Sequence, residues 1–142
     1  MPPALIPYKT EAEYRRHYET HYCKVTIHTF DGIRVYFPKQ QFDGAFYESA
    51  NRRARDKSLF SWRRAERIDW IRAALEDPTA ELYVGWDRNK KKLNPGRRVA
   101  LVYQNYVVIL RMNIKRKRAT FITAYVAGPT TIAKIRNGPR WK

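Results

Sequence analysis

An arginine stands where an apolar residue is expected in the segment SWRRAERIDWIRAALEDP, residues 61–78. Its apolar residues recur at helical spacing, and one turn before Ile68 this buried row reaches Arg64. A guanidinium on such a row needs an anion, and its planar fork suits the oxygens of a phosphate. Arg67 flanks the same row. A plainer interpretation is that the Arg64 stem covers the core while its head pairs with an acid such as Glu48.

The strand-like segment ATFITAYV, residues 119–126, carries hydroxyl groups that could bind a ligand. Strand alternation predicts an outward face of Phe121, Thr123 and Tyr125 and a core face of Ile122, Ala124 and Val126. On the outward face, hydroxyls can donate to phosphate oxygens and an aromatic ring can stack on a base. Threonine and tyrosine are also ordinary residues of a sheet surface, so this pattern alone does not define a site.

A glycine interrupts the helix-like stretch FDGAFYES, residues 42–49. Glycine costs roughly 1 kcal/mol relative to alanine inside a helix, so Gly44 needs a reason. Three explanations are open. The helix starts later than its pattern suggests, a different side chain belonged at this position, or glycine permits a close approach of backbone or ligand.

Metal chemistry has little support in the sequence. His17 and His21 are one helical turn apart and Cys23 follows, but a fourth zinc ligand is missing. There is no glycine-rich phosphate loop, and the acidic residues form no pair typical of two-metal nucleases. We therefore predict neither a metal nor a cofactor. RNA can still be cut, because its own 2′-hydroxyl is the nucleophile and side chains suffice as acid, base and cation.

The charge distribution points to nucleic acid. The chain has 142 residues and a formal net charge of +16. Residues 1–87 carry 14 lysines and arginines against 13 acids, whereas residues 88–142 carry 15 and no acid. A polyanion is the usual partner of such a surface, although a basic surface also serves solubility. The predicted nucleic-acid-binding residues are Lys57, Lys90, Lys91, Lys92, Arg97, Arg98, Lys115, Arg116, Lys117 and Arg118.

The elements that must position these residues follow from periodicity and turn signals. Helices are predicted for EAEYRRHYETH, which Thr10 and Glu13 cap, for FDGAFYESANRRAR, and from Ser61 to just before Pro78. KVTIHTF and GIRVYF form a hairpin at Asp31-Gly32. The predicted strands of the main sheet are AELYVGW, RVALVYQ, YVVILRMN and ATFITAYV. DRNKKKLNPGR is predicted to be a long basic loop and IKRKRA a shorter basic turn, followed by a short helix or ordered arm.

These elements predict an α+β fold in which N-terminal helices pack on one antiparallel sheet of about four strands. Residues 1–142 form a single domain, with an N-terminal helix or arm at 1–24, a core at 25–127 and a basic C-terminal arm at 128–142. The longest unbroken apolar run is YVVIL, far too short to cross a membrane. We therefore expect a soluble, unprocessed, cytoplasmic protein with no membrane partner.

Three short motifs in order resemble one known family. They are F-x-x-A-F at residues 42–46, R-A-E-R-I-x-W-I at 64–71 and T-A-Y at 123–125. Together they are similar to the phage-type nucleases of the barnase, EndoU, colicin and RelE superfamily, and the resemblance spans about residues 25 to 127. That family implies an RNase-toxin-like fold and a toxic, metal-independent endoribonuclease, with tRNA among the candidate substrates and an acidic antitoxin or immunity protein as partner.

The resemblance also implies roles for single residues. The family's first motif reads Phe-x-His-Ala-Phe, with the histidine as general acid or base, and Gly44 occupies its place in this chain. Arg64 and Arg67 resemble the phosphate-binding cations, and Thr123 and Tyr125 resemble the residues of the final strand. Loss of the histidine, by natural decay or deliberate inactivation, then explains the glycine and makes the chain inactive.

Two other classes of function stay open. One is a non-catalytic RNA- or DNA-binding module that uses the same basic surface. The other is a phage structural or packaging-associated protein whose basic end contacts nucleic acid. An arginine on a buried row beside a Thr-x-Tyr strand favours the nuclease, because a pure binding module has no need of it.

Overall fold

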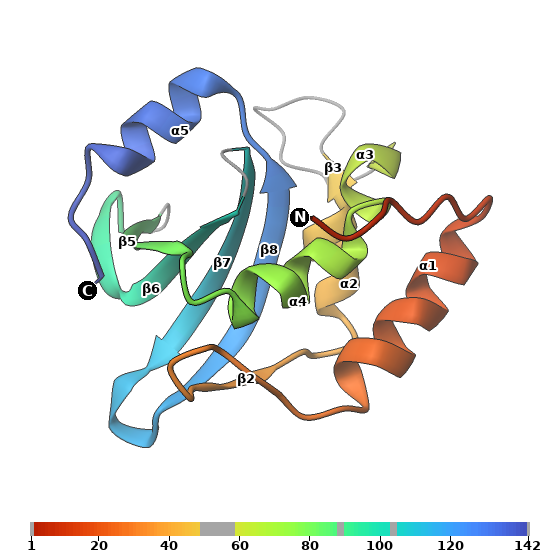
Figure 1. The fold of residues 1–142 in the computed structure, drawn as a ribbon, viewed down its shortest axis with the longest axis horizontal. Helices are drawn as coiled ribbons and strands as arrows, with labels where there is room; N and C mark the ends of the chain where they lie inside the picture. Colours follow the sequence, from red (N-terminus) through yellow and green to blue (C-terminus); the bar gives the residue numbers. More distant parts are fainter. Residues whose placement is uncertain (1, 49–58, 88–89, 103–104, 142) are drawn as a thin grey trace.

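The computed structural model describes residues 2–48, 59–87, 90–102 and 105–141 (Figure 1). The helices are α1 (Glu11–Tyr18), the π-helix η1 (Glu19–Cys23), α2 (Gln41–Phe46), α3 (Trp62–Ala65), α4 (Ile68–Glu76), the 3-10 helix η2 (Ile114–Arg116) and α5 (Pro129–Arg136). The strands are β1 (Ile27–His28), β2 (Arg34–Tyr36), β3 (Tyr47–Glu48), β4 (Leu59–Phe60), β5 (Glu81–Asp87), β6 (Lys92–Val102), β7 (Tyr106–Asn113) and β8 (Arg118–Val126).

The fold is α+β, as predicted, but its sheet is larger than the sequence indicated. Strands β5 to β8 form the expected antiparallel meander. The predicted N-terminal hairpin joins it, giving six strands in the order β1-β2-β8-β7-β6-β5. The prediction of about four antiparallel strands was therefore wrong: β2 runs parallel to β8, with Arg34 opposite Arg118. This pairing satisfies backbone groups at an edge of β8 that a four-stranded meander would leave open.

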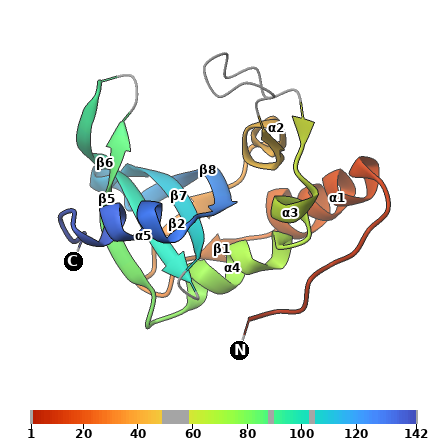
Figure 2. The ribbon, with the colours of Figure 1, turned by 90° about the horizontal axis from the view of Figure 1, so that it is seen from above.

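Helices lie on both faces of the sheet (Figure 2). The larger core joins α1, α2 and α4 to one face, with Tyr18, Phe42 and Phe121 fully buried at its centre. The smaller core lies under α5 on the other face, where Ile132 packs against Tyr83 and Val107. Residues 128–142 therefore include a helix that covers part of the sheet.

The predicted helices are confirmed at their starts, and the last of them also ends before Pro78 as predicted, but each differs in its course. The Thr10 side chain caps α1 by accepting from the Glu13 backbone, and Ser61 caps α3 by accepting from the Arg64 backbone. The helix expected over FDGAFYESANRRAR ends at Phe46, after which β3 pairs with β4, and the last seven residues of that stretch, 49–55, lie outside the described residues. The helix expected from Ser61 is interrupted at Glu66 and Arg67, which separate α3 from α4.

The basic connection between β5 and β6 is mostly strand. Residues 92–97, expected in a long loop, belong to β6 and pair in part with the end of β5. The shorter basic turn holds η2 and ends at Lys117, whose φ of 51° lies in the left-handed region. Within the described part of the chain, no helix is long and apolar enough to cross a membrane.

Candidate functional site

Four of the five predicted catalytic residues meet beside β8. The Thr123 hydroxyl donates a hydrogen bond of 3.2 Å to the backbone carbonyl of Gly44. The guanidinium carbon of Arg64 lies 5.7 Å from the centroid of the Tyr125 ring, over its face. Residues from α2, α3 and β8, far apart in the sequence, therefore form one cluster.

The cluster lies where β8 extends beyond its parallel neighbour. β2 pairs with β8 only as far as Thr120, and α2 lies along the edge that follows (Figure 1). There the Gln41 side-chain amide donates to the backbone carbonyl of Ile122. The edge that β2 leaves open is thus covered by a helix, which brings Gly44 beside Thr123.

A β-bulge sets which side chains of β8 face this edge. The pairing with β7 shifts between Leu110, which is opposite Phe121, and Ile109, which is opposite Thr123. Phe121 and Ala124 are both fully buried. The predicted alternation, with Phe121 outward beside Thr123, was therefore wrong, because the extra residue of a bulge reverses the two faces of a strand.

Arg64 is half-buried, and its charge is already partly offset. Its side chain is 18% exposed, and its Nε lies 3.4 Å from an Oε of Glu48. Its Nη1 donates to the Ala45 carbonyl at 3.3 Å. Burial lowers the pKa of Arg64, and the nearby Glu48 carboxylate opposes that shift. The ion pair with Glu48, which was the plainer interpretation of Arg64, is thus present, together with the contact to Tyr125.

Arg67 points into a different environment from Arg64. Its Nη1 donates to the Arg63 carbonyl at 2.7 Å and to Glu66 at 2.8 Å, and its guanidinium lies 5.3 Å from the Trp70 ring centroid. No described contact joins it directly to Gly44 or to β8. We therefore place Arg67 at the margin of the cluster.

Tyr106 is a residue that the sequence analysis missed. It is fully buried, and among the described residues its hydroxyl has no hydrogen-bond partner. Burial raises the pKa of Tyr106, while the positive charges of Arg64 and Arg67 act in the opposite direction. Tyr106 therefore lies near both arginines. Nothing in the run YVVIL distinguishes it from a packing residue.

The space around Gly44 decides between the explanations of this glycine. A Cβ on residue 44 would lie 2.8 Å from the Gln41 amide nitrogen and 3.8 Å from the Ile122 carbonyl oxygen. The second distance is an ordinary contact, so only the end of the flexible Gln41 side chain must move. A side chain at this position would project toward β8, and the backbone approach of α2 to β8 does not require glycine.

The predicted nucleic-acid-binding residues lie in three environments. Lys57 falls outside the described residues. The exposed ones are at two turns of the sheet, namely Lys90, Lys91 and Lys92 beside β6 and Lys115, Arg116, Lys117 and Arg118 beside β8. Arg97 is half-buried, 3.9 Å from Asp87. Arg98 is 1% exposed and pairs with Asp31 at 3.3 Å, so we omit it from the binding surface.

The histidine pair is part of a local hydrogen-bond network. The Nε2 atom of His17 lies 2.8 Å from a carboxylate oxygen of Asp69, and its Nδ1 lies 3.0 Å from the Tyr8 hydroxyl. The His21 ring lies beside that of His17 in a tilted arrangement, with ring centroids 4.5 Å apart. Among the described residues no three His, Cys, Asp or Glu side chains are grouped to hold a metal ion. The network ties the N-terminal segment to α1 and α4.

No model of a protein family, no curated protein and no solved structure matches this chain. Function is therefore inferred from the residues and their geometry. At the β8 edge, a cation, a tyrosine ring, a threonine hydroxyl and room for a side chain at residue 44 lie together. Such a set can bind a phosphate group and, given a proton-transfer group at residue 44, could support cleavage beside it.

Proposed function

We propose that the protein is a metal-independent endoribonuclease-like domain of the toxin type, in which Gly44 replaces the proton-transfer residue. Its substrate is RNA, with tRNA among the candidates, and an acidic antitoxin or immunity protein is its expected partner. The observation that carries the proposal is the cluster itself. Three short motifs, separated by up to about eighty residues, supply neighbouring groups at one edge of the sheet: the Gly44 carbonyl and the side chains of Arg64, Thr123 and Tyr125.

The roles follow from the chemistry of each group. Arg64 neutralises the phosphate as negative charge develops on its oxygens, and Tyr125 and Thr123 orient the substrate. A histidine at residue 44 takes the proton of the 2′-hydroxyl or protonates the leaving oxygen. Imidazole suits this step near neutral pH, since its unperturbed pKa is about 6.5. The 2′-oxygen bonds to phosphorus as the 5′-oxygen leaves, which yields a 2′,3′-cyclic phosphate.

The test is the substitution Gly44→His. The variant should cleave RNA in the presence of EDTA and leave cyclic phosphate ends, whereas the glycine form should be nearly silent. A proton-transfer group contributes typically about 10²- to 10⁴-fold in rate. The imidazole must displace the Gln41 amide from the Ile122 carbonyl, which costs on the order of 1 kcal/mol. Replacing a glycine inside a helix stabilises the helix by a similar amount, so the thermal stability of the variant should be nearly unchanged.

Gly44→Asn is the matched control, because asparagine displaces Gln41 in the same way but cannot transfer a proton at neutral pH. It should bind RNA and cut nothing. If Gly44→His folds, binds RNA as the glycine form does and also cuts nothing, the nuclease proposal is wrong.

The second candidate function is a non-catalytic RNA-binding module. The observation in its favour is that Arg64 already has partners, with its Nε beside Glu48 and its Nη1 on the Ala45 carbonyl. A basic sheet surface that needs no catalytic group also supports it. The experiment on Gly44→His separates the two functions, since a binding module gains no activity from the histidine.

A further inference from the structure

One face of the sheet carries arginines that none of the described helices covers. Residues that pair directly across strands share a face, as do alternate residues of one strand. By these rules the register places one set on the face opposite the larger core: Arg34 and Tyr36 of β2, Arg118 and Thr120 of β8, Arg111 and Asn113 of β7, and Arg97 of β6. We call this set the arginine face. Helix α5 covers only the neighbouring part of the same side.

The arginine face contains two pairs of like charges directly opposite each other. Arg34 is opposite Arg118 across β2 and β8, and Arg97 is opposite Arg111 across β6 and β7. Such pairs destabilise a sheet unless an anion lies between them. Among the described residues, Arg34, Arg111 and Arg118 have no ion pair. Arg97 lies 3.9 Å from Asp87, so within the described structure the fold supplies a counterion to one of these four arginines and leaves the other three without one.

An aromatic ring lies within this charge. Tyr36 is 40% exposed, and the guanidinium carbons of Arg34 and Arg118 lie 4.6 Å and 6.0 Å from its ring centroid. The Nε of Arg34 is buried, and it has no hydrogen-bond partner within the described part of the chain. Exposed tyrosine beside unpaired arginine is the combination that stacks a base and holds the adjoining phosphate.

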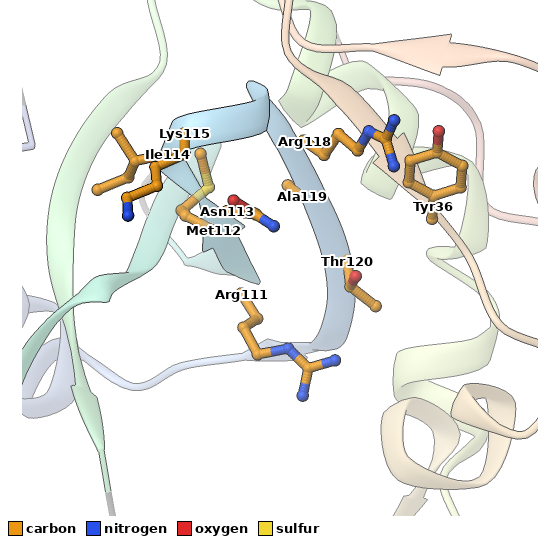
Figure 3. Close-up of a pocket in the computed structure, with 9 residues that line it drawn as sticks. All are labelled: Tyr36, Arg111, Met112, Asn113, Ile114, Lys115, Arg118, Ala119 and Thr120. Atoms are coloured by element: carbon orange, nitrogen blue, oxygen red, sulfur yellow. The ribbon is translucent and has the colours of Figure 1, made fainter.

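The surface is hollowed at this place. A cavity of about 600 Å³ is lined by Tyr36, Arg118 and Thr120 on one side and by Arg111, Asn113 and Lys115 on the other. Figure 3 shows the Arg118 guanidinium beside the Tyr36 ring, with Arg111 and Thr120 extending from neighbouring strands. None of its lining residues is acidic. Strands are about 4.8 Å apart, so the arginines from β2 to β6 cover roughly 14 Å, more than one phosphate needs.

We propose that this cavity binds a segment of single-stranded RNA, with an unstacked base on Tyr36 and phosphates on Arg34, Arg111 and Arg118. A single strand fits because the bases of a duplex are already stacked on each other and offer no free face to Tyr36. The choice of RNA over DNA rests on the function proposed above. The cavity itself was not among the predicted sites, which included only Arg118 and Lys115 of its lining.

The position of the cavity relates it to the candidate site. Thr120 of the cavity and Thr123 of the cluster are three residues apart on β8, a distance of about 10 Å along a strand. Both are on the side of the sheet that faces away from the larger core, because Thr123 is opposite Ile109 and Thr120 is opposite Arg111. A strand of RNA held on the arginine face can therefore continue along β8 to Arg64 and Tyr125.

The test measures the binding of a fluorescein-labelled 12-nucleotide oligouridylate to the full chain by anisotropy, at several salt concentrations. Tyr36→Ala should weaken binding roughly 5- to 150-fold, and Tyr36→Phe should bind like the wild type because it keeps the ring. Arg111→Gln should lower the slope of log affinity against log salt by about 0.7 for each lost phosphate contact. Arg16→Gln, an exposed arginine of α1 without an ion pair in the described structure, is the charge-matched control and should change neither quantity.

Three outcomes would overturn the inference. The first two are that Tyr36→Ala binds like the wild type, or that Arg16→Gln weakens binding as much as Arg111→Gln. The third is that either polyglutamate or a 12-base-pair RNA duplex displaces the probe as effectively as unlabelled oligouridylate does. Polyglutamate competition would assign the face to an acidic protein. The nuclease proposal is judged separately. If Tyr36→Ala loses binding while Gly44→His cuts nothing, the RNA-binding role of the cavity is supported and the nuclease proposal is wrong. If Tyr36→Ala binds normally while Gly44→His cleaves RNA, only the role of the cavity is rejected.

Discussion

The buried pair of Arg98 and Asp31 should dominate stability among the charged residues. Both side chains are at most 10% exposed, and their nearest charged atoms are 3.3 Å apart. Asp31→Asn leaves the guanidinium buried without its counterion, and breaking such a pair typically costs about 3 to 5 kcal/mol. We expect that loss in the free energy of unfolding, measured with urea.

The exposed pair Arg72–Glu76 offers the comparison for Asp31→Asn. Its two side chains are 46% and 48% exposed, and Glu76→Gln should cost no more than about 0.5 kcal/mol. Equal effects of the two substitutions would mean that burial does not strengthen the Arg98 pair.

Arg64 can be tested in the Gly44→His variant, which the proposed function expects to be active. In Gly44→His, the further change Arg64→Lys should keep the fold but reduce cleavage about 10- to 150-fold, the equivalent of one lost charge-assisted hydrogen bond. Lysine keeps the charge beside Glu48 but lacks the planar fork that grips two phosphate oxygens. The measurement is kcat/KM on a defined RNA, with melting temperature as the check on folding. A double variant that cleaves as fast as Gly44→His would show that Arg64 serves only as a structural ion pair.

The residue types of the cluster were readable from the sequence, but their surroundings were not. Arg64 was found because it breaks an apolar row, and Gly44 because it breaks a helix pattern. Arg98 was misjudged as a surface cation, since its partner Asp31 is in a distant turn. Tyr106 could not be recognised in the sequence, because its position near two arginines depends on how distant segments pack together.

At the scale of elements, Ser61 is the cap that holds Arg64 in place. Its hydroxyl accepts from the Arg64 backbone and donates to Glu48, both at 3.2 Å. Ser61→Ala should therefore lower the free energy of unfolding by about 1 to 2 kcal/mol. Thr10→Ala, which removes the cap of α1, should cost about 1 kcal/mol and leave RNA binding unchanged. If Ser61→Ala leaves both stability and RNA binding unchanged, the cap does not position the arginine.

Most elements were predictable because their signals are local. Capping residues gave the starts of α1 and α3, and alternation gave the meander. The bulge in β8 and the parallel pairing of β2 were not predictable, because both depend on contacts between residues far apart in the sequence. The end of α2 at Phe46 also depends on a contact between separate segments, since Tyr47 and Glu48 pair with β4 instead of continuing the helix.

For the whole molecule, buried tyrosines predict a loss of stability at alkaline pH. Burial raises the pKa of Tyr22 and Tyr106 above the ordinary value of 10. The unfolded chain releases these protons near pH 10 while the folded chain keeps them, so their contribution is complete below pH 10 and declines above it. The expected loss approaches about 1.4 kcal/mol per pH unit for each tyrosine, measured by urea unfolding from pH 9 to 11.5.

Tyr106→Phe is the informative variant for this pH dependence. Its hydroxyl has no hydrogen-bond partner in the described structure, so its removal should leave stability at pH 7 unchanged or higher. The variant should also lose less stability above pH 10. The same slope in both proteins would exclude Tyr106 as a source of the effect.

The pairing of β2 with β8 has a consequence for how the protein is made. Residue 34 cannot find its neighbour until residue 118 has left the ribosome, so the sheet cannot close while only the first part of the chain has emerged. The cluster of Gly44, Arg64 and Thr123 must wait for the same strand. If the proposed nuclease function is correct, a nascent chain whose β8 has not yet emerged would therefore be harmless to the RNA of the ribosome that makes it.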